Sequence, residues 1–160
     1  MNGSKRYRKR VNCLAVIASS AFAGANLFIG LSMGFYWLML DPLAFVSVFW
    51  PMFTSFLFTV MPLFLLTLLG LVLSARIDWH DPNLKKLWLY AIALYAVVSL
   101  ITVLYHIPEN LRLREGLYSD AEASAARMYW LVGHIPRMVL AVAIPLLCMA
   151  SIHQYRDQSQ

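Results

Sequence analysis

The stretch that decides the fold runs from residue 42 to residue 75, PLAFVSVFWPMFTSFLFTVMPLFLLTLLGLVLSA, and contains no charged residue. A helix needs only about 20 apolar residues to cross a hydrocarbon core about 30 Å thick. Residues 11–40 form a second uncharged stretch of sufficient length. Over the whole chain 61% of residues are hydrophobic and 13% are charged, whereas about 25% are charged in an ordinary soluble domain. The sequence therefore predicts an integral membrane protein and excludes a soluble enzyme, a disordered tail and a nucleic-acid-binding domain.

The first two spans follow from these stretches. Residues 21–23 have the A-x-A form of a signal-peptide cleavage site. Because the apolar residues continue to Leu40, we expect a retained first span at residues 11–37. Residues 42–75 in one straight helix would be about 50 Å long. Pro51 suits the first turn of a helix, where its missing N–H would be unpaired anyway. We therefore place the second span at residues 50–75, with a kink at Pro62. Residues 41–49 are expected to form an outer connection or a short interfacial segment.

The second half of the chain predicts two more spans. Residues 87–107 form the third, and Pro108 is expected to end it. An outer polar loop follows at residues 108–127. Ser119 and Glu122 have the spacing of a capping box, so the fourth helix is expected to begin there, outside the lipid, and to cross the membrane at residues 128–152. The predicted fold is one all-α transmembrane domain of residues 1–160, a four-helix bundle whose fourth helix is kinked by proline.

The distribution of Lys and Arg predicts the orientation. Five precede the first span, three lie in the loop of residues 76–86 and one lies in the C-terminal tail, against three in the outer loop. Nine against three places both termini in the cytoplasm, because cytoplasmic loops carry the excess of positive charge. The expected location is the cell membrane, which is the inner membrane if the source is bacterial.

Small residues and aromatic residues both suggest contacts of the spans. Gly30 and Gly34 form a small-xxx-small pair, which permits close helix packing within the bundle or in a homo-oligomer. Membrane lipid is the other expected partner. All five tryptophans fall near predicted span ends, as an interfacial belt would place them: Trp37, Trp50, Trp79, Trp88 and Trp130. Only Trp130, on nearly the same helix face as His134, is a candidate pocket wall.

Polar residues inside the spans are the candidates for function, because they are costly in hydrocarbon. Since the third and fourth spans are antiparallel neighbours, the end of one meets the start of the other. This predicts one polar cluster in the outer half of the bundle, made of Asn26, His106, Glu109, Asn110, His134 and Arg137.

Arg137 is the most informative of these residues. It lies about 13 Å into the fourth span, counted from Met128 at 1.5 Å per residue. An isolated arginine can extend its side chain to the membrane surface. However, Pro136 precedes it and leaves the carbonyl of Val132 without its helical partner, which requires a protein contact or a polar cavity. The combination of His134, Pro136 and Arg137 favours a site.

Two kinds of site remain open. In a catalytic site, His134 is the candidate general base and Arg137 the candidate holder of a developing oxyanion. Asn26, His106, Glu109, Asn110 and Trp130 would then bind and orient a lipophilic small molecule, with no cofactor required. Alternatively, His106, His134 and Glu109 form a plausible ligand set for a transition metal, although no two of them have the spacing of a metal motif on one helix.

The segments H-I-P-E-N at residues 106–110 and H-I-P-R at residues 134–137, with Trp130 between them, resemble the anthrone oxygenase-like family of small four-helix membrane proteins. The family pattern is an Asn-x-Pro-x-Asn turn, then a Trp, then His-x-x-Arg. Its matches in this chain are Pro108, Asn110, Trp130, His134 and Arg137, and glycines of the first span are also similar. His106 stands where the pattern has its first Asn.

The resemblance implies oxygenation of an anthrone to an anthraquinone without an obvious cofactor, as in fungal members, while many bacterial members have no known function. The first functional hypothesis is therefore a small membrane oxygenase or related redox protein that acts on a lipophilic phenol-, anthrone- or quinone-like compound. Two alternatives remain. One is a non-catalytic membrane subunit or assembly factor whose polar cluster specifies helix packing. The other is a metal-binding membrane protein that uses histidines.

Overall fold

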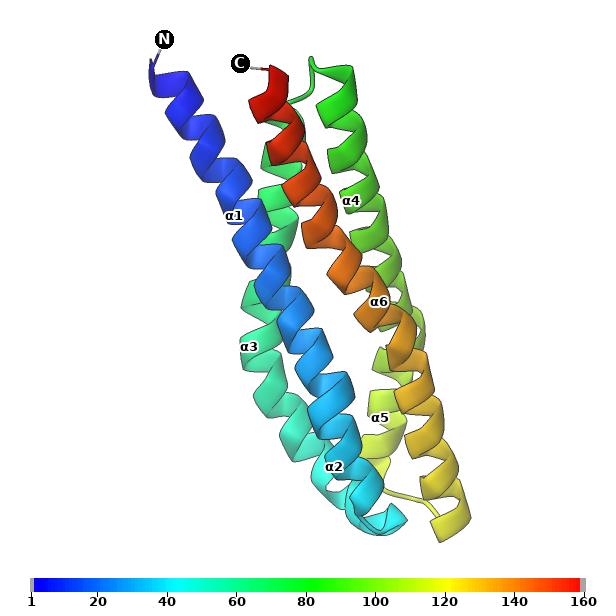
Figure 1. The fold of residues 1–160 in the computed structure, drawn as a ribbon. Helices are drawn as coiled ribbons and strands as arrows, with labels where there is room; N and C mark the ends of the chain where they lie inside the picture. The colour runs from blue at the N-terminus through cyan, green and yellow to red at the C-terminus, as the bar shows by residue number, and fades with distance from the viewer. Residues whose placement is uncertain (1, 159–160) are drawn as a thin grey trace.

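A computed structural model describes residues 2–158 of the chain, with side chains for residues 5–155. Four helical rods lie side by side, with both termini and the α3–α4 turn at the same end of the bundle (Figure 1). The first two rods are α1 (Asn2–Leu27), the π-helical segment η1 (Phe28–Met33) and α2 (Gly34–Met39), and then α3 (Pro42–Ile77). The last two are α4 (Pro82–Ile101), the π-helical segment η2 (Thr102–His106) and α5 (Ile107–Glu115), and then α6 (Asp120–Gln158).

Each rod is long and apolar enough to cross a membrane. The candidate spans are Lys5–Met39, Pro42–Ile77, Pro82–Glu115 and Asp120–Tyr155. A helix of this length measures about 50 Å at 1.5 Å per residue, so each rod extends beyond a hydrocarbon core of about 30 Å. The all-α four-helix bundle predicted from the sequence is confirmed, and the protein is a multi-pass membrane protein.

The second rod begins earlier than predicted. The α3 helix starts with Pro42 in its first turn and continues through Pro51, so the expected connection at residues 41–49 is wrong. Phe45 and Phe49 are fully buried, with ring centroids 5.7 and 5.5 Å from that of Trp37. Contacts between these aromatic rings compensate for the helical hydrogen bond that Pro51 removes.

The third rod also runs past its predicted end. Pro108 does not end the helix, because it falls in the first turn of α5, directly after the π-helical segment η2. Gly116, with φ of 71°, terminates the helix instead, in the left-handed conformation that glycine adopts without strain. The predicted outer loop at residues 108–127 is therefore mostly helical, and residues 116–119 alone form the turn between α5 and α6.

The predicted start of the fourth helix is confirmed. The backbone N–H and hydroxyl of Ser119 donate to Glu122 Oε2 at 2.8 and 2.7 Å, and the Glu122 N–H donates to Ser119 Oγ at 3.4 Å. This reciprocal pair is a capping box. From there α6 continues through Pro136 and Pro145 without interruption.

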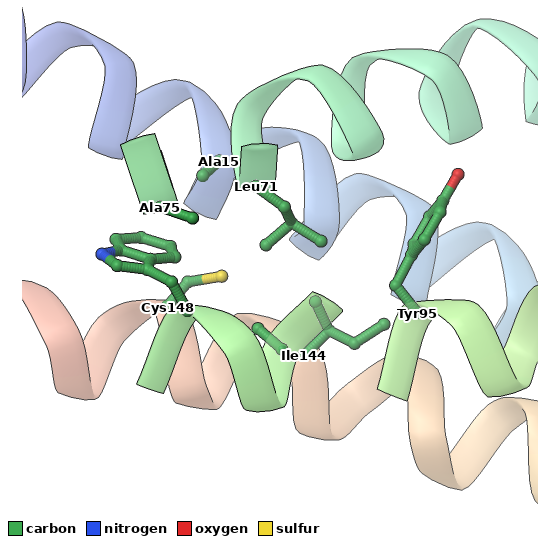
Figure 2. Packing of buried hydrophobic residues seen from close by; sticks show 8 residues of the cluster. Ala15, Leu71, Ala75, Tyr95, Ile144 and Cys148 are labelled. Carbon is green, nitrogen blue, oxygen red and sulfur yellow. The ribbon is translucent and has the colours of Figure 1, made fainter. Parts of the chain in front are cut away.

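The half of the bundle nearer the termini has a close-packed apolar core. Leu71, Ile144 and Cys148 lie between the four rods, with Tyr95 at the border of this cluster (Figure 2). A Cβ atom on Gly70 would lie 2.7 Å from the Ala15 Cα, so the glycine allows α1 and α3 to approach closely. This packed half supports the half of the bundle farther from the termini, which we call the outer half.

Gly30 and Gly34 contact α6 of the same chain. A Cβ atom on Gly30 would lie 2.8 Å from His134 Cδ2, and one on Gly34 would lie 2.9 Å from Leu131 Cδ2. Both glycines therefore admit side chains of the fourth rod into the bundle. A homo-oligomer formed through them stays a prediction.

A buried carboxylate joins three rods near the termini. Asp78, at the end of α3, forms an ion pair with Arg8 at 2.6 Å and accepts hydrogen bonds from Trp88 Nε1 at 2.7 Å and Asn12 Nδ2 at 3.4 Å. The Arg8 guanidinium also lies over the ring of Tyr155 in α6, 3.6 Å from its centroid. From the sequence, Arg8 was predicted only to be one of the five positive charges before the first span, and this cluster was not predicted.

Replacing Asp78 with alanine is expected to destabilise the bundle strongly, because it leaves the Arg8 charge and the Trp88 N–H without their buried partner. Breaking one side of a buried ion pair costs about 3–5 kcal/mol. Asp81 is the matched control, since its Oδ1 only caps α4, and removing such a cap costs about 1 kcal/mol. Unfolding titrations in detergent, followed by circular dichroism, measure both variants. An Asp78→Ala loss no larger than that of Asp81→Ala contradicts the assignment.

Candidate functional site

A cavity of about 450 Å³ lies in the outer half of the bundle. Every rod contributes to its wall, and along α3 the wall runs from Phe49 to Phe64. Aromatic and aliphatic side chains make up most of it, among them Phe22, Trp37, Phe53, Phe56, Val60 and Val103. Its strongly polar members are His106, Asn110, His134 and Arg137. The polar cluster predicted from the sequence is therefore placed largely around one apolar cavity.

Arg137 is directed into the bundle and does not extend to the membrane surface. The residue is only 9% exposed, and its side chain lines the cavity. Nη1 lies 3.3 Å from His134 Nδ1, and among the described side chains no carboxylate lies within ion-pair distance of the guanidinium. Its Nε atom is buried without a hydrogen-bond partner. A buried charge normally has a counter-charge, so this unpaired cation marks the site.

His134 uses both ring nitrogens within the protein. Nε2 lies 3.0 Å from the carbonyl oxygen of Asn26 in α1, and that oxygen can only accept a hydrogen bond. The proton is therefore assigned to Nε2, which leaves Nδ1 as the acceptor for Arg137. Because neither nitrogen is free, His134 fixes the position of Arg137 in this arrangement and is poorly placed to act as the general base predicted from the sequence.

His106 is the free imidazole of the site. It is the last residue of η2, is 1% exposed and lines the cavity. The Gly133 backbone lies near the ring, but neither ring nitrogen forms a hydrogen bond of standard geometry with a described residue. The His106 ring centroid lies 5.5 Å from that of His134 and 4.9 Å from that of Trp130. A buried imidazole without partners can exchange a proton with a ligand.

Trp130 and Asn110 form the outer wall next to the histidines. The Trp130 ring stacks on His134 at 5.0 Å, with an angle of 13° between the planes. Its Nε1 donates to Asn110 Oδ1 at 2.7 Å, so Asn110 can offer mainly its amide N–H donors to a ligand. The expected interfacial belt is wrong for Trp37, Trp88 and Trp130, which are all buried, because their rings pack between the rods.

Two predicted site residues do not line the cavity. Glu109 turns away, pairs with Arg112 at 3.0 Å and lines a separate outer pocket of about 470 Å³ between α5 and α6. Asn26 lies beside the site but contributes its backbone carbonyl, while its side-chain Nδ2 donates to Phe22 O at 2.9 Å. The ligand set of His106, His134 and Glu109 is not assembled, and the described residues contain no group of three or more potential metal ligands.

Two features of the site were not predicted from the sequence. Arg127, counted as an outer-loop charge, is buried and donates to the carbonyls of Trp37 and Leu40 at 2.8 and 2.6 Å, where it caps the end of α2. The π-helical segments η1 and η2 lie on two sides of the site, and such segments are frequent at functional sites. Asn26 lies two residues before η1, and His106 is the last residue of η2.

Comparison of the chain with models of known protein families, with curated proteins and with solved structures found no match. The resemblance to the anthrone oxygenase-like family therefore stays a prediction from the sequence.

Proposed function

We propose that this protein is a small membrane oxygenase or related redox enzyme that acts on a lipophilic phenol-, anthrone- or quinone-like compound in the outer cavity. The observation that carries the proposal is the guanidinium of Arg137, without a carboxylate partner among the described side chains, in a mostly apolar cavity. Lys and Arg are in excess at the end of the bundle that carries both termini. We therefore further propose that the protein lies in the cell membrane, which is the inner membrane in a bacterium, with both termini in the cytoplasm.

The charge of Arg137 selects a ligand with an acidic oxygen. Removing a charge from water without a partner is unfavourable, and a phenolate or enolate oxygen would supply the missing partner. The cavity volume of about 450 Å³ lies within the range typical of small-molecule sites. Aromatic walls around one cationic group suit a hydrophobic ring system with a single anionic oxygen.

The free imidazole of His106 supplies the acid–base group in this proposal, in place of His134. With anthrone as substrate, His106 accepts a proton from the central CH2 group, and the resulting enolate oxygen pairs with Arg137. Molecular oxygen is the oxidant and adds at the central carbon. Loss of the second hydrogen with cleavage of the O–O bond forms the new carbonyl, and the other oxygen atom leaves as water after His106 returns its proton. Anthrone is thereby oxidised by four electrons, and one O2 is reduced.

The proposal is tested with the purified protein in lipid nanodiscs, with anthrone as substrate. We expect anthraquinone to form faster than in empty nanodiscs, with one O2 consumed per anthraquinone, as measured by absorbance and with an oxygen electrode. An oxidation rate equal to that of empty nanodiscs, over a series of anthrones and phenols that bind to the protein, contradicts the enzymatic proposal.

One observation favours a second candidate function. The His134–Asn26 hydrogen bond joins α6 to α1 in the membrane interior, as a polar group that specifies helix packing would do. A non-catalytic subunit or assembly factor needs only the packing contacts among Asn26, His134 and Arg137. In that case Arg137 variants would unfold, and no ligand would be required.

A further inference from the structure

The cavity is closed toward both ends of the bundle. At the outer end Trp37, Phe49 and Trp130 are buried, with ring centroids between 5.2 and 5.6 Å apart. At the inner end Phe22 and Phe64 pack together with ring centroids 6.0 Å apart. Neither end therefore offers a ligand a direct path to water.

The side of the cavity is open. Four of its lining residues are also exposed on the outside of the bundle: Leu57 (41%) and Met61 (44%) of α3, Val103 (56%) of η2 and Ile107 (43%) of α5. We call these four residues the rim. All of them are aliphatic or thioether side chains within candidate membrane spans, so the opening between α3 and the η2–α5 junction faces hydrocarbon.

We infer that the substrate reaches the cavity sideways from the bilayer, through the rim, as the neutral form of a weak acid that becomes an anion only beside Arg137. The inference rests on the proposed function and specifies its substrate class and route. An anion is excluded from this route, because a charge in the hydrocarbon core is strongly unfavourable. The neutral acid dissolves in lipid and meets only apolar side chains at the rim.

The proton must be lost inside the cavity. The O–H bond of a phenol breaks, or the C–H bond of the central CH2 group in an anthrone. The proton forms an N–H bond at a free ring nitrogen of His106, and the resulting oxygen anion pairs with Arg137. Both polar groups needed for this step are open to a ligand: neither ring nitrogen of His106 forms a hydrogen bond of standard geometry, and Arg137 has no carboxylate partner among the described side chains. Release reverses the step, so the ligand leaves through the rim in the neutral form.

The test measures how the rim controls the rates of binding. The probe is 2,4,6-tribromophenol, a lipophilic weak acid, in a buffer below its own pKa so that the dissolved probe is mainly neutral. Its bromine atoms quench tryptophan fluorescence, here that of Trp37 and Trp130 on the cavity wall. Stopped-flow mixing with nanodiscs gives association and dissociation rates. The rim variant is Leu57→Phe with Val103→Phe, which narrows the opening. The matched control is Leu65→Phe with Leu100→Phe, at positions that are exposed on α3 and α4 but do not line the cavity.

We expect the narrowed rim to lower both rates by about tenfold, equivalent to 1.4 kcal/mol in each barrier, with little change in the dissociation constant. The control variant should match the wild type. A second variant, Leu57→Ala with Val103→Ala, should raise both rates and covers the case in which the phenylalanine variant does not fold. Unchanged rates in the alanine variant, or equal effects in the rim and control variants, contradict entry through the rim.

These experiments distinguish a failure of the proposed entry route through the rim from a failure of the proposed function. If the rates for tribromophenol depend on the rim but no anthrone or phenol is turned over, entry through the rim is supported and the enzymatic function is contradicted. If anthrone is turned over but the binding rates do not depend on the rim, the enzymatic function is supported and entry through the rim is contradicted.

Discussion

Arg137→Met is expected to lower the rate of anthrone oxidation by about a hundredfold or more while the bundle remains folded. Removing one donor that stabilises a developing oxyanion typically costs about 10²–10³ in rate. The fold should tolerate the change, because methionine has a similar length and replaces an unpaired buried charge with an apolar side chain, a change that is often neutral or stabilising. Turnover and detergent unfolding of the same preparation measure both expectations.

Two further variants sharpen this prediction. Arg137→Lys keeps the positive charge without the planar guanidinium, so it should retain part of the activity. Arg112→Met removes an exposed arginine that pairs with Glu109 outside the cavity and should leave turnover unchanged. If Arg137→Met instead unfolds and Arg137→Lys restores folding without any turnover, the polar cluster serves helix packing, and the non-catalytic function is favoured.

The second large effect is expected from assigning the general base to His106 and not, as predicted from the sequence, to His134. His106→Ala should lower turnover by about 10²–10⁴, the usual contribution of a general base. Added imidazole should restore part of the rate, because the substitution leaves a space next to the ligand. His134→Asn should cost far less, about tenfold, since its amide oxygen can replace Nδ1 as the acceptor for Arg137 at a loss of one hydrogen bond, about 1 kcal/mol.

His134→Gln is the matched comparison for that prediction. A glutamine amide can replace Nε2 as the donor to the Asn26 carbonyl but does not present an acceptor to Arg137. We therefore expect His134→Gln to be less active than His134→Asn, in steady-state assays at equal protein concentration. Complete loss of activity in both His134 variants, with an active His106→Ala, would return the role of the base to His134.

The number of the spans and their apolar character could be predicted from the sequence, because both depend on local properties. Residues 11–40 and 42–75 lack charges, and such stretches of sufficient length have few alternatives to membrane helices. The convergence of His106, His134 and Arg137 also followed, since antiparallel neighbouring spans bring the end of one rod to the start of the next.

The ends of the helices depended on tertiary contacts that the sequence does not display. Proline at position 51 predicted a helix start, but the burial of Phe45 and Phe49 against Trp37 extends α3 to Pro42. Pro108 predicted a helix end, but the preceding π-helical segment carries the chain into α5. In both cases the residue preference was real and weaker than the packing around it.

The roles within the site could not be predicted for a similar reason. A histidine that is three residues from an arginine suggests a base, but the Asn26 carbonyl from a distant helix takes the proton-bearing nitrogen of His134. Glu109 lies one turn from His106 in the sequence, yet its contact with Arg112 directs it to another pocket. Hydrogen-bond partners from other rods decide which polar groups remain free for a ligand.

The most direct measurement of the central claim compares the binding of 2,4,6-tribromophenol with that of its methyl ether, 2,4,6-tribromoanisole, at equilibrium in nanodiscs. In a buffer below the pKa of the phenol both dissolved probes are neutral and have nearly the same shape and similar hydrophobicity, but only the phenol can lose a proton and pair with Arg137. We predict that the wild type binds the phenol at least about tenfold more tightly, 1.4 kcal/mol or more, and that Arg137→Met removes this preference. Equal binding of the two probes by the wild type, or a preference that survives Arg137→Met, would contradict the account.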